Sequence, residues 1–286
     1  YFEYLRNMEI NLTDRFAALS HPQRMDVLRL LLRRFPGAVS AGDIAGALAI
    51  KPATLSAYLT QLRQVGLISQ TRQGTSLLYT PHIAGLRQMT EDLMFDCCRG
   101  RPDLCPPFPS ANQTGDRIMS SKTYRVLFIC SGNSARSIFA ESLLRHEAGD
   151  RFEAYSAGTR PTSELNPMAV TMLKDKGHDV DGLSSKNVNV FQGPDAPDFD
   201  FVFTVCDMAA NEDCPTWPGQ PLTAHWGTPD PVKAEGTEAE RMLAFQHAYG
   251  MLRHRIMAFS ALPFETLDQL SLQSALDDIA RMEAPE

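Results

Sequence analysis

Residues 125–137 have the sequence Arg-Val-Leu-Phe-Ile-Cys-Ser-Gly-Asn-Ser-Ala-Arg-Ser. The apolar run that ends at Cys130 predicts a buried strand of a parallel sheet, and residues 137–148 predict a helix. A loop between such a strand and a helix N-terminus can surround one tetrahedral oxyanion, because its amides and the helix dipole both favour negative charge. The oxyanion-binding residues that we expect are Ser131, Gly132, Asn133, Ser134, Ala135 and Ser137.

Cys130 and Arg136 are the two reactive side chains of this loop, with five residues between them. The arginine offers a planar fork for two oxygens, and the Ser137 hydroxyl is expected to bind the sulfur and lower the pKa of Cys130. Gly132 and Asn133 tolerate the positive φ values that turn consecutive amides toward one point. The loop therefore predicts a cysteine nucleophile located at its own anion site.

The surrounding sequence alternates strands and helices, which predicts an α/β three-layer fold with a parallel sheet. Further strands are expected at 152–156 and 199–206, and helices at 166–176 and 237–259. Histidines 178, 225, 247 and 254 have neither ligand spacing nor a partner carboxylate in the sequence, so packing or surface roles are expected for them.

Three more side chains after the loop have reactive chemistry. Cys206 ends the strand predicted at 199–206, and Cys214 follows eight positions later. The alternative is that Cys206 is simply buried and that Cys214 has no chemical role. Asp230 precedes Pro231, and a turn residue before proline is the alternative to a chemical role there.

Residues 124–260 resemble the low-molecular-weight protein tyrosine phosphatase family, in the loop from Cys130 and in Trp226-Gly-Thr-Pro-Asp-Pro. The resemblance implies that Asp230 is the general acid. Residues 206–219, Cys-Asp-Met-Ala-Ala-Asn-Glu-Asp-Cys-Pro-Thr-Trp-Pro-Gly, are similar to the redox segment of arsenate reductases that share this fold. Phosphatases of the family usually have a second cysteine inside the loop and tyrosines after the Asp-Pro pair. This chain has Ala135 and Val232-Lys-Ala-Glu there, which favours the reductase.

The resemblance also implies a mechanism. Cys130 attacks arsenate held by Arg136, and Asp230 protonates the departing oxygen. Cys206 then forms a disulfide with Cys130 and releases arsenite, and Cys214 takes over that disulfide. An external thiol reductant completes the cycle, either thioredoxin or a small thiol with glutaredoxin, and no tightly bound cofactor is expected. In some relatives a potassium site is lined by residue types that match Asn133, Glu141 and Ser156.

The first 121 residues carry 13 basic and 10 acidic side chains, whereas the rest carry 14 and 24. The basic excess lies within residues 12–80, which is compatible with a face that meets a polyanion. Helices are predicted at 13–19, 22–34 and 52–65, with a short helix capped by Ser40, and strands at 67–71 and 76–80. This order predicts a helix-turn-helix followed by a hairpin wing.

Leu19-Ser-His-Pro-Gln-Arg-Met-Asp-Val-Leu and the segment 53–68 resemble the ArsR/SmtB family of dimeric winged-helix repressors, over roughly residues 12–100. The resemblance implies a homodimer through this domain whose helix 52–65 enters the major groove of operator DNA. The expected base-reading residues are Thr54, Ser56, Tyr58 and Gln61, and the expected phosphate contacts are Lys51 and Arg72.

Cys97, Cys98 and Cys105 lie at and after the end of a helix predicted at 83–99. Three thiolates suit a soft trigonal ion such as trivalent arsenic. A subgroup of arsenic-responsive repressors is similar in this respect, which implies arsenite or antimonite as the regulatory ligand. Packing of the cysteines in a dimer and a zinc site are the alternatives, and zinc would need a fourth ligand.

A chain of 286 residues suggests about two domains at roughly 150 residues each. The predicted parts are a winged-helix domain at 8–100, a proline-rich linker at 101–121, the reductase domain at 122–262 and a C-terminal helix of open role at 263–286. No apolar run approaches the roughly 20 residues of a membrane span, and no secretory signal is present, so a cytoplasmic protein is expected.

The combined prediction is an arsenite-responsive repressor fused to an arsenate reductase, with residual phosphatase activity. Both halves would act on the same chemical species, because arsenite is the product of the predicted reductase and the proposed ligand of the repressor. A reductase with a degenerate helical appendage and a tyrosine phosphatase with a DNA-binding regulator domain are the rivals.

Overall fold

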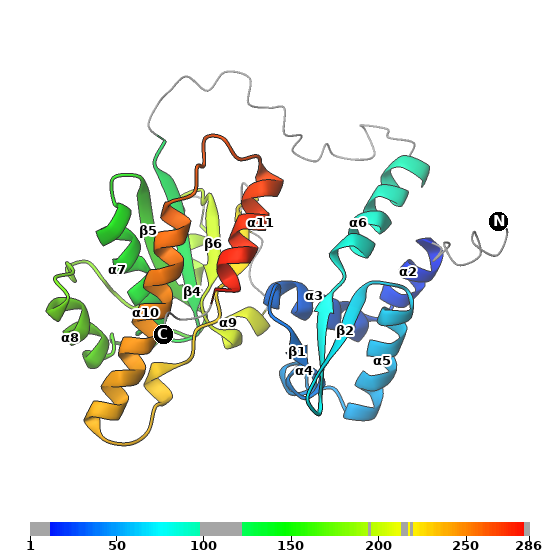
Figure 1. The fold of residues 1–286 in the computed structure, drawn as a ribbon, viewed down its shortest axis with the longest axis horizontal. Helices are drawn as coiled ribbons and strands as arrows, with labels where there is room; N and C mark the ends of the chain where they lie inside the picture. The colour runs from blue at the N-terminus through cyan, green and yellow to red at the C-terminus, as the bar shows by residue number, and fades with distance from the viewer. Residues whose placement is uncertain (1–11, 98–121, 194–195, 213–216, 218–219, 283–286) are drawn as a thin grey trace. The chain divides into compact units, whose positions relative to one another are not determined.

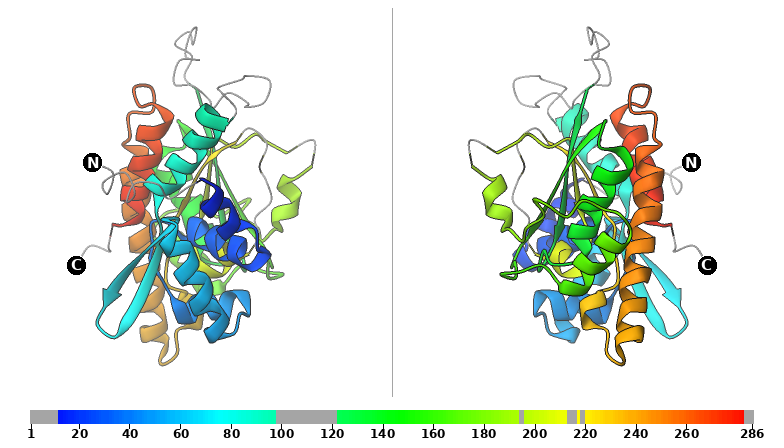
Figure 2. Two further views of the ribbon diagram at one scale, coloured as in Figure 1. Left: turned by 90° about the vertical axis from the view of Figure 1, so that its right-hand side faces the viewer. Right: turned by 90° about the vertical axis from the view of Figure 1, so that its left-hand side faces the viewer.

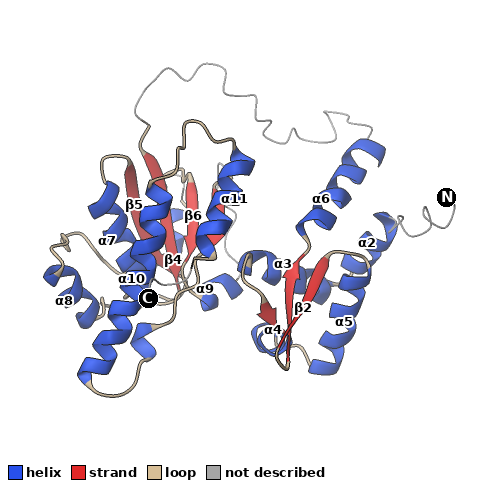
Figure 3. Cartoon of the chain, in the orientation of Figure 1, coloured by secondary structure: helices blue, strands red, loops and turns tan. Residues whose placement is uncertain are grey.

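The computed structural model describes residues 12–97, 122–193, 196–212, 217 and 220–282. The chain divides into two compact units, Tyr1–Gly115 and Asp116–Glu286, each with its own hydrophobic core. The fold class predicted from the sequence is confirmed: a winged helix-turn-helix unit and an α/β unit with a parallel sheet (Figure 3). Cys98, Cys105, Cys214 and the predicted linker lie outside the described residues.

The first unit is a set of helices with a three-stranded antiparallel sheet of order β1-β3-β2 (Figure 1). Pro22 and Pro52 begin two of its helices at the first position, where a missing N–H costs nothing, and the Ser40 hydroxyl caps a third. Its elements are α2 (Leu12–Leu19), α3 (Pro22–Arg34), β1 (Val39–Ser40), α4 (Ala41–Leu48), α5 (Pro52–Gln64), β2 (Ile68–Gln73), β3 (Ser76–Pro81), α6 (Ile83–Glu91) and the π-helical turn η1 (Asp92–Cys97).

The second unit has a four-stranded parallel sheet of order β5-β4-β6-β7. Helices α7 and α10 pack against each other, and α7 also packs against β4 and β5. Its elements are β4 (Tyr124–Cys130), α7 (Arg136–Ala148), β5 (Phe152–Gly158), α8 (Pro167–Asp175), η2 (Val188–Phe191), β6 (Phe201–Thr204), α9 (Asp207–Asn211), β7 (Leu222–His225), η3 (Pro231–Lys233), α10 (Glu238–Ser260) and α11 (Gln269–Ala280).

The structure corrects three element boundaries. The helix predicted at 83–99 is α-helical only to Glu91 and continues as the π-helical η1. The strand predicted at 199–206 is four residues long, and the four-residue β7 beside it is too short to give a periodic signal. The tail helix begins at Gln269 rather than at 263, because the Asp268 carboxylate accepts a hydrogen bond from Ser271 N and caps it there.

The C-terminal helix α11 belongs to the core of the second unit. Its side chains Leu272, Leu276 and Ile279 are buried in the same cluster as the sheet. Figures 1 and 2 show α11 lying beside α10, and its Gln273 amide donates a hydrogen bond to Thr223 O on β7. The helix whose role the sequence leaves open therefore covers part of the parallel sheet of the second unit.

Candidate active site and candidate DNA-binding surface

Cys130 lies at the carboxyl end of β4 with 2% of its surface exposed. Its sulfur accepts a hydrogen bond from Asn133 N at 3.1 Å and lies 3.0 Å from the Ser137 hydroxyl. Asn133 has the predicted positive φ, 45°, but Gly132 does not, so one left-handed residue is enough to turn the loop. The strand, the turn and the start of α7 thus place the sulfur at the centre of a ring of donors.

The pKa of Cys130 is raised, contrary to the lowering expected from the sequence. Burial is the largest cause, and repulsion by the neighbouring Cys206 thiol adds to it. The hydrogen bonds of Ser137 and the charge of Arg136 act in the predicted direction, but they do not outweigh burial. Desolvation could not be anticipated, because the motif alone does not show how completely the fold covers the loop.

Cys206 brings a second buried thiol to the same loop. Its sulfur accepts a hydrogen bond from Ser131 N at 3.2 Å and another from Ala209 N at 3.4 Å, so it caps the short helix α9. Both Cys130 and Cys206 are free thiols. The carboxyl ends of adjacent parallel strands meet at one edge of a sheet, and here β4 ends at Cys130 while Cys206 follows the end of β6.

Arg136 and Asp230 meet directly. The guanidinium donates from Nη2 to Asp230 Oδ2 at 2.8 Å and from Nη1 to Thr228 O at 3.1 Å. Asp230 also caps η3, since its Oδ1 accepts a hydrogen bond from Val232 N at 3.3 Å. The turn role and a chemical role for Asp230 are therefore compatible, because the two carboxylate oxygens are used separately.

Two residues that the sequence did not single out, Lys186 and Gly158, support the loop from other segments. The Asn133 amide donates to the hydroxyls of Ser137 and Ser156 and accepts from Lys186 N at 2.7 Å. Gly158 allows close approach, because a Cβ there would lie 2.7 Å from Ser131 O. These contacts join segments far apart in the sequence, so no local pattern could have revealed them.

The residues expected to line a potassium site do not fit that ion in this fold. The buried Glu141 carboxylate is paired with Arg145, accepts a hydrogen bond from Ser156 and lies 3.7 Å from Lys186 Nζ. Two side-chain cations therefore already neutralise it. Burial lowers the pKa of Lys186, while the charge of Glu141 opposes that change. Among the described residues, no cluster of three His, Cys, Asp or Glu side chains could hold a metal ion.

His225 has a partner that its sequence neighbourhood did not show. Its Nε2 lies 3.1 Å from Asp207 Oδ1, and its Nδ1 lies 2.9 Å from the Thr204 hydroxyl. The pair joins the end of β7 to the residue after Cys206. This corrects the expectation that His225 lacks a partner carboxylate. The sequence does not show the pair, because Asp207 follows β6 whereas His225 ends β7.

In the first unit, α5 buries Leu55, Leu59 and Leu62 and exposes Ser56 and Gln61. The remaining predicted DNA contacts are placed as follows: Lys51 is exposed and precedes α5, Thr54 is half-buried, and Arg72 is exposed and donates to Gly74 O at the wing tip.

Tyr58 differs from the other predicted base-reading residues, because its side chain is tied to α3. Its hydroxyl donates to Gln23 Oε1 at 3.0 Å and lies 3.3 Å from His21 Nε2, and its ring packs on His21. We therefore assign Tyr58 a role in joining the two helices.

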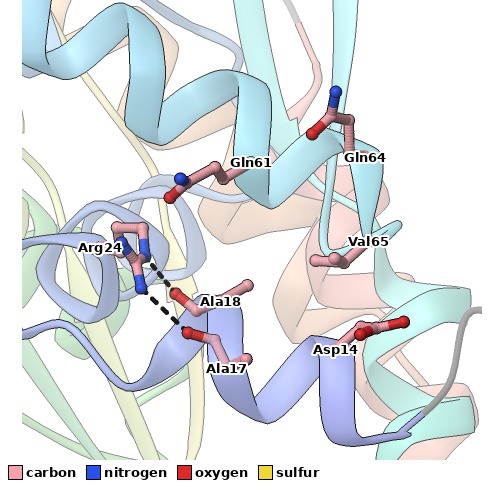
Figure 4. A pocket seen from close by; sticks show the side chains of 7 residues that line it. All are labelled: Asp14, Ala17, Ala18, Arg24, Gln61, Gln64 and Val65. Carbon is pink, nitrogen blue, oxygen red and sulfur yellow. Dashed lines mark hydrogen bonds between the residues drawn. The ribbon is translucent and has the colours of Figure 1, made fainter.

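A pocket of about 460 Å³ lies between α2 and α5 (Figure 4). Arg24 extends into it and donates to Ala17 O and Ala18 O at the end of α2, while Gln61 reaches toward it from α5. The arginine thus adds hydrogen bonds to carbonyls at the end of α2 and joins α2 to α3. The other residues that line the pocket are Asp14, Gln64 and Val65.

The second unit has the site of a cysteine-dependent enzyme that acts on oxyanions: a buried thiol in an anion-binding loop, with an arginine of that loop paired to a carboxylate. Residues 125–270, half of the chain, match the low molecular weight phosphotyrosine protein phosphatase family, and the chain belongs to this family. Residues 19–71 match a helix-turn-helix domain. No helix among the described residues is long and apolar enough to span a membrane.

Similar proteins are named arsenate reductases. One from Shouchella clausii is 38% identical over 135 residues, which are 47% of this chain and 94% of that protein. One from Bacillus licheniformis is 38% identical over 143 residues, 50% of this chain and 97% of that protein. A solved structure of an arsenate reductase in the oxidized state is 25% identical, covers 49% of this chain and 98% of its own, and has a TM-score of 0.41.

Proposed function

We propose that the second unit reduces arsenate to arsenite at Cys130, and that the first unit binds operator DNA and responds to that product. The reductase domain is supported by its family and by relatives with that name. The observation that carries the chemistry is the position of Cys206, whose sulfur is hydrogen-bonded to the loop that holds the nucleophile. Hydrolysis of a phosphate ester needs no second thiol there.

Arsenate binds with its oxygens against the loop amides and Arg136. The Cys130 thiolate donates an electron pair to arsenic(V), Asp230 gives its proton to the departing oxygen, and water leaves. The result is a covalent sulfur–arsenic(V) bond. In the structure Asp230 pairs with Arg136, which holds the carboxylate beside the loop. Arsenate takes its place on the guanidinium, and Asp230 acts as the acid in its protonated form.

The electrons that reduce arsenic come from the thiols. Cys206 attacks the Cys130 sulfur and forms a disulfide, and the pair of electrons in the sulfur–arsenic bond leaves with arsenic, which departs as arsenite. Cys214 then attacks Cys206, restores the Cys130 thiol and leaves a Cys206–Cys214 disulfide. Thioredoxin, or a small thiol with glutaredoxin, returns this disulfide to two thiols.

An ionised Cys130 and an ionised Cys206 repel each other, which is one cause of the raised pKa of Cys130. The disulfide forms only after arsenic is bound, because arsenic(V) is the oxidant that accepts the two electrons.

The test compares Cys206→Ser with the wild-type chain under excess thioredoxin system. Wild type releases many equivalents of arsenite, whereas the variant releases none beyond background but still hydrolyses an aryl phosphate. Steady arsenate turnover by Cys206→Ser would overturn the shuttle. Phosphotyrosine hydrolysis without arsenate reduction by wild type would favour a phosphatase with a regulator domain.

For the first unit, the proposal is a cytoplasmic homodimeric repressor whose Cys97, Cys98 and Cys105 bind arsenite or antimonite. Binding of the ion shifts the dimer toward a form whose recognition helices no longer match the groove. The triple Cys→Ser variant is expected to bind operator DNA as tightly as wild type, and arsenite should not release it in a fluorescence-anisotropy titration. If arsenite still releases this variant from operator DNA, the arsenite site lies at other residues.

A further inference from the structure

Arg255 of α10 is a buried cation that the chemistry above does not use. Only 5% of its surface is exposed, and burial lowers its pKa. None of the ion pairs among the described residues includes it, so backbone carbonyls and one hydroxyl compensate its charge. A buried charge held in this way favours a single arrangement of the segments that supply its partners, because a buried cation without partners is strongly unfavourable.

One side of the guanidinium binds the loop that carries Asp230. Nη1 donates to Gly227 O at 3.0 Å and lies 3.5 Å from the Thr228 hydroxyl. The carbonyl of the same Thr228 accepts a hydrogen bond from Arg136. The segment 226–230 is therefore held between two arginines, one from the oxyanion loop and one from α10.

The other side binds the end of α11. Nη2 donates to Ala280 O and Met282 O, each at 3.3 Å. The last carbonyls of a helix lack intrahelical partners and carry partial negative charge, so a guanidinium suits them. The family match ends at residue 270, and α11 spans Gln269–Ala280, so nearly all of this helix lies beyond the family's domain.

We propose that Arg255 is a positioning residue, which with the end of α11 fixes the loop of the general acid against Arg136 of the oxyanion loop. This inference rests on the acid role proposed for Asp230. The hydrogen-bonded path runs from the α11 carbonyls through Arg255 to Gly227 and Thr228, and from Thr228 through Arg136 to Asp230. The C-terminal extension thereby contributes to the active site without touching the substrate.

The test uses the full-length chain and the variants Arg255→Met, Arg255→Lys, Asp230→Asn and the double variant Arg255→Met/Asp230→Asn. Arg253→Met is the matched control, because Arg253 lies on the same helix and pairs with Glu147. Arsenate kcat and KM are measured across pH, and thermal melting shows that each variant is folded at the assay temperature.

We expect Arg255→Met to lower kcat roughly tenfold or more, the scale of a displaced catalytic group. In the plot of kcat against pH, Arg255→Met should also remove the fall in rate that deprotonation of Asp230 causes, as Asp230→Asn does. The double variant should be no slower than Asp230→Asn, Arg255→Lys should recover part of the rate, and Arg253→Met should stay within twofold of wild type.

A merely structural role predicts a different result. Additive losses in the double variant, or an unchanged pH profile in folded Arg255→Met, would overturn the positioning role. An inactive wild-type chain would instead contradict the reductase itself, so the two failures are distinguishable.

Discussion

The oxyanion loop and the recognition helix are both predicted from short sequence patterns, but the fold holds them in opposite ways. Cys130, Asn133 and Arg136 are buried. Hydrogen bonds within the loop hold the Cys130 sulfur, and other parts of the unit hold Asn133 and Arg136. On α5, Ser56 and Gln61 are exposed. A site that binds one small anion needs side chains that the fold itself holds in place. A surface that contacts a polymer must instead leave its hydrogen-bond donors exposed for the partner.

The strongest test of this contrast is Cys130→Ser. The serine hydroxyl is a far weaker nucleophile than a thiolate and cannot pass electrons to arsenic as a disulfide forms. Arsenate reduction should fall to the uncatalysed background, as measured by arsenite release. Operator binding by the same variant should equal wild type in a gel-shift assay, and a parallel loss of DNA binding would break the separation of the two regions.

The second test is Asp230→Asn, which keeps the size of the side chain and its cap on η3 but removes the proton. The first chemical step should slow by ~10²-fold, the usual scale of a lost general acid. Rapid-mixing single-turnover experiments measure that step directly. Rates equal to wild type would mean that Asp230 only shapes the turn.

The contrast also explains what the sequence predicts well. A strand, a loop and a helix N-terminus lie within residues 125–137, so their chemistry could be predicted from one segment. Lys186, Gly158, Arg255 and the His225–Asp207 pair could not, because their contacts join distant segments through the core. In the first unit the hydrogen bond of Tyr58 to Gln23 likewise joins α5 to α3, which the position of Tyr58 on α5 does not show.

The third test concerns the wing. Arg72 is exposed at the hairpin tip, and its predicted phosphate contact carries no sequence information. Arg72→Ala should weaken operator and random DNA alike, and it should reduce the slope of log affinity against log salt by about one. Fluorescence anisotropy at several salt concentrations measures both quantities. A loss confined to the operator would instead make Arg72 a base reader.

The smallest expected effect is a shift in the pKa of Cys130, and its titration probes the buried loop directly. Burial and the Cys206 thiol raise its pKa, while Ser137 and Arg136 lower it, so removing one neighbour at a time should shift the pKa in opposite directions. Cys206→Ser removes a repelling charge and should lower the pKa of Cys130. Ser137→Ala removes a hydrogen bond to the thiolate and should raise it.

The rate of alkylation of Cys130 by iodoacetamide, followed on its peptide by mass spectrometry, reports the thiolate fraction at each pH. Because the raised pKa keeps the thiol protonated, the wild-type rate should rise with pH beyond the range of an ordinary cysteine. The Cys206→Ser curve should lie at lower pH than wild type, and the Ser137→Ala curve at higher pH. Ser142→Ala is the control, since that buried serine of α7 bonds to His178 instead. If both test variants shift the curve the same way, altered burial of the loop, and not these two neighbours, sets the reactivity of the nucleophile.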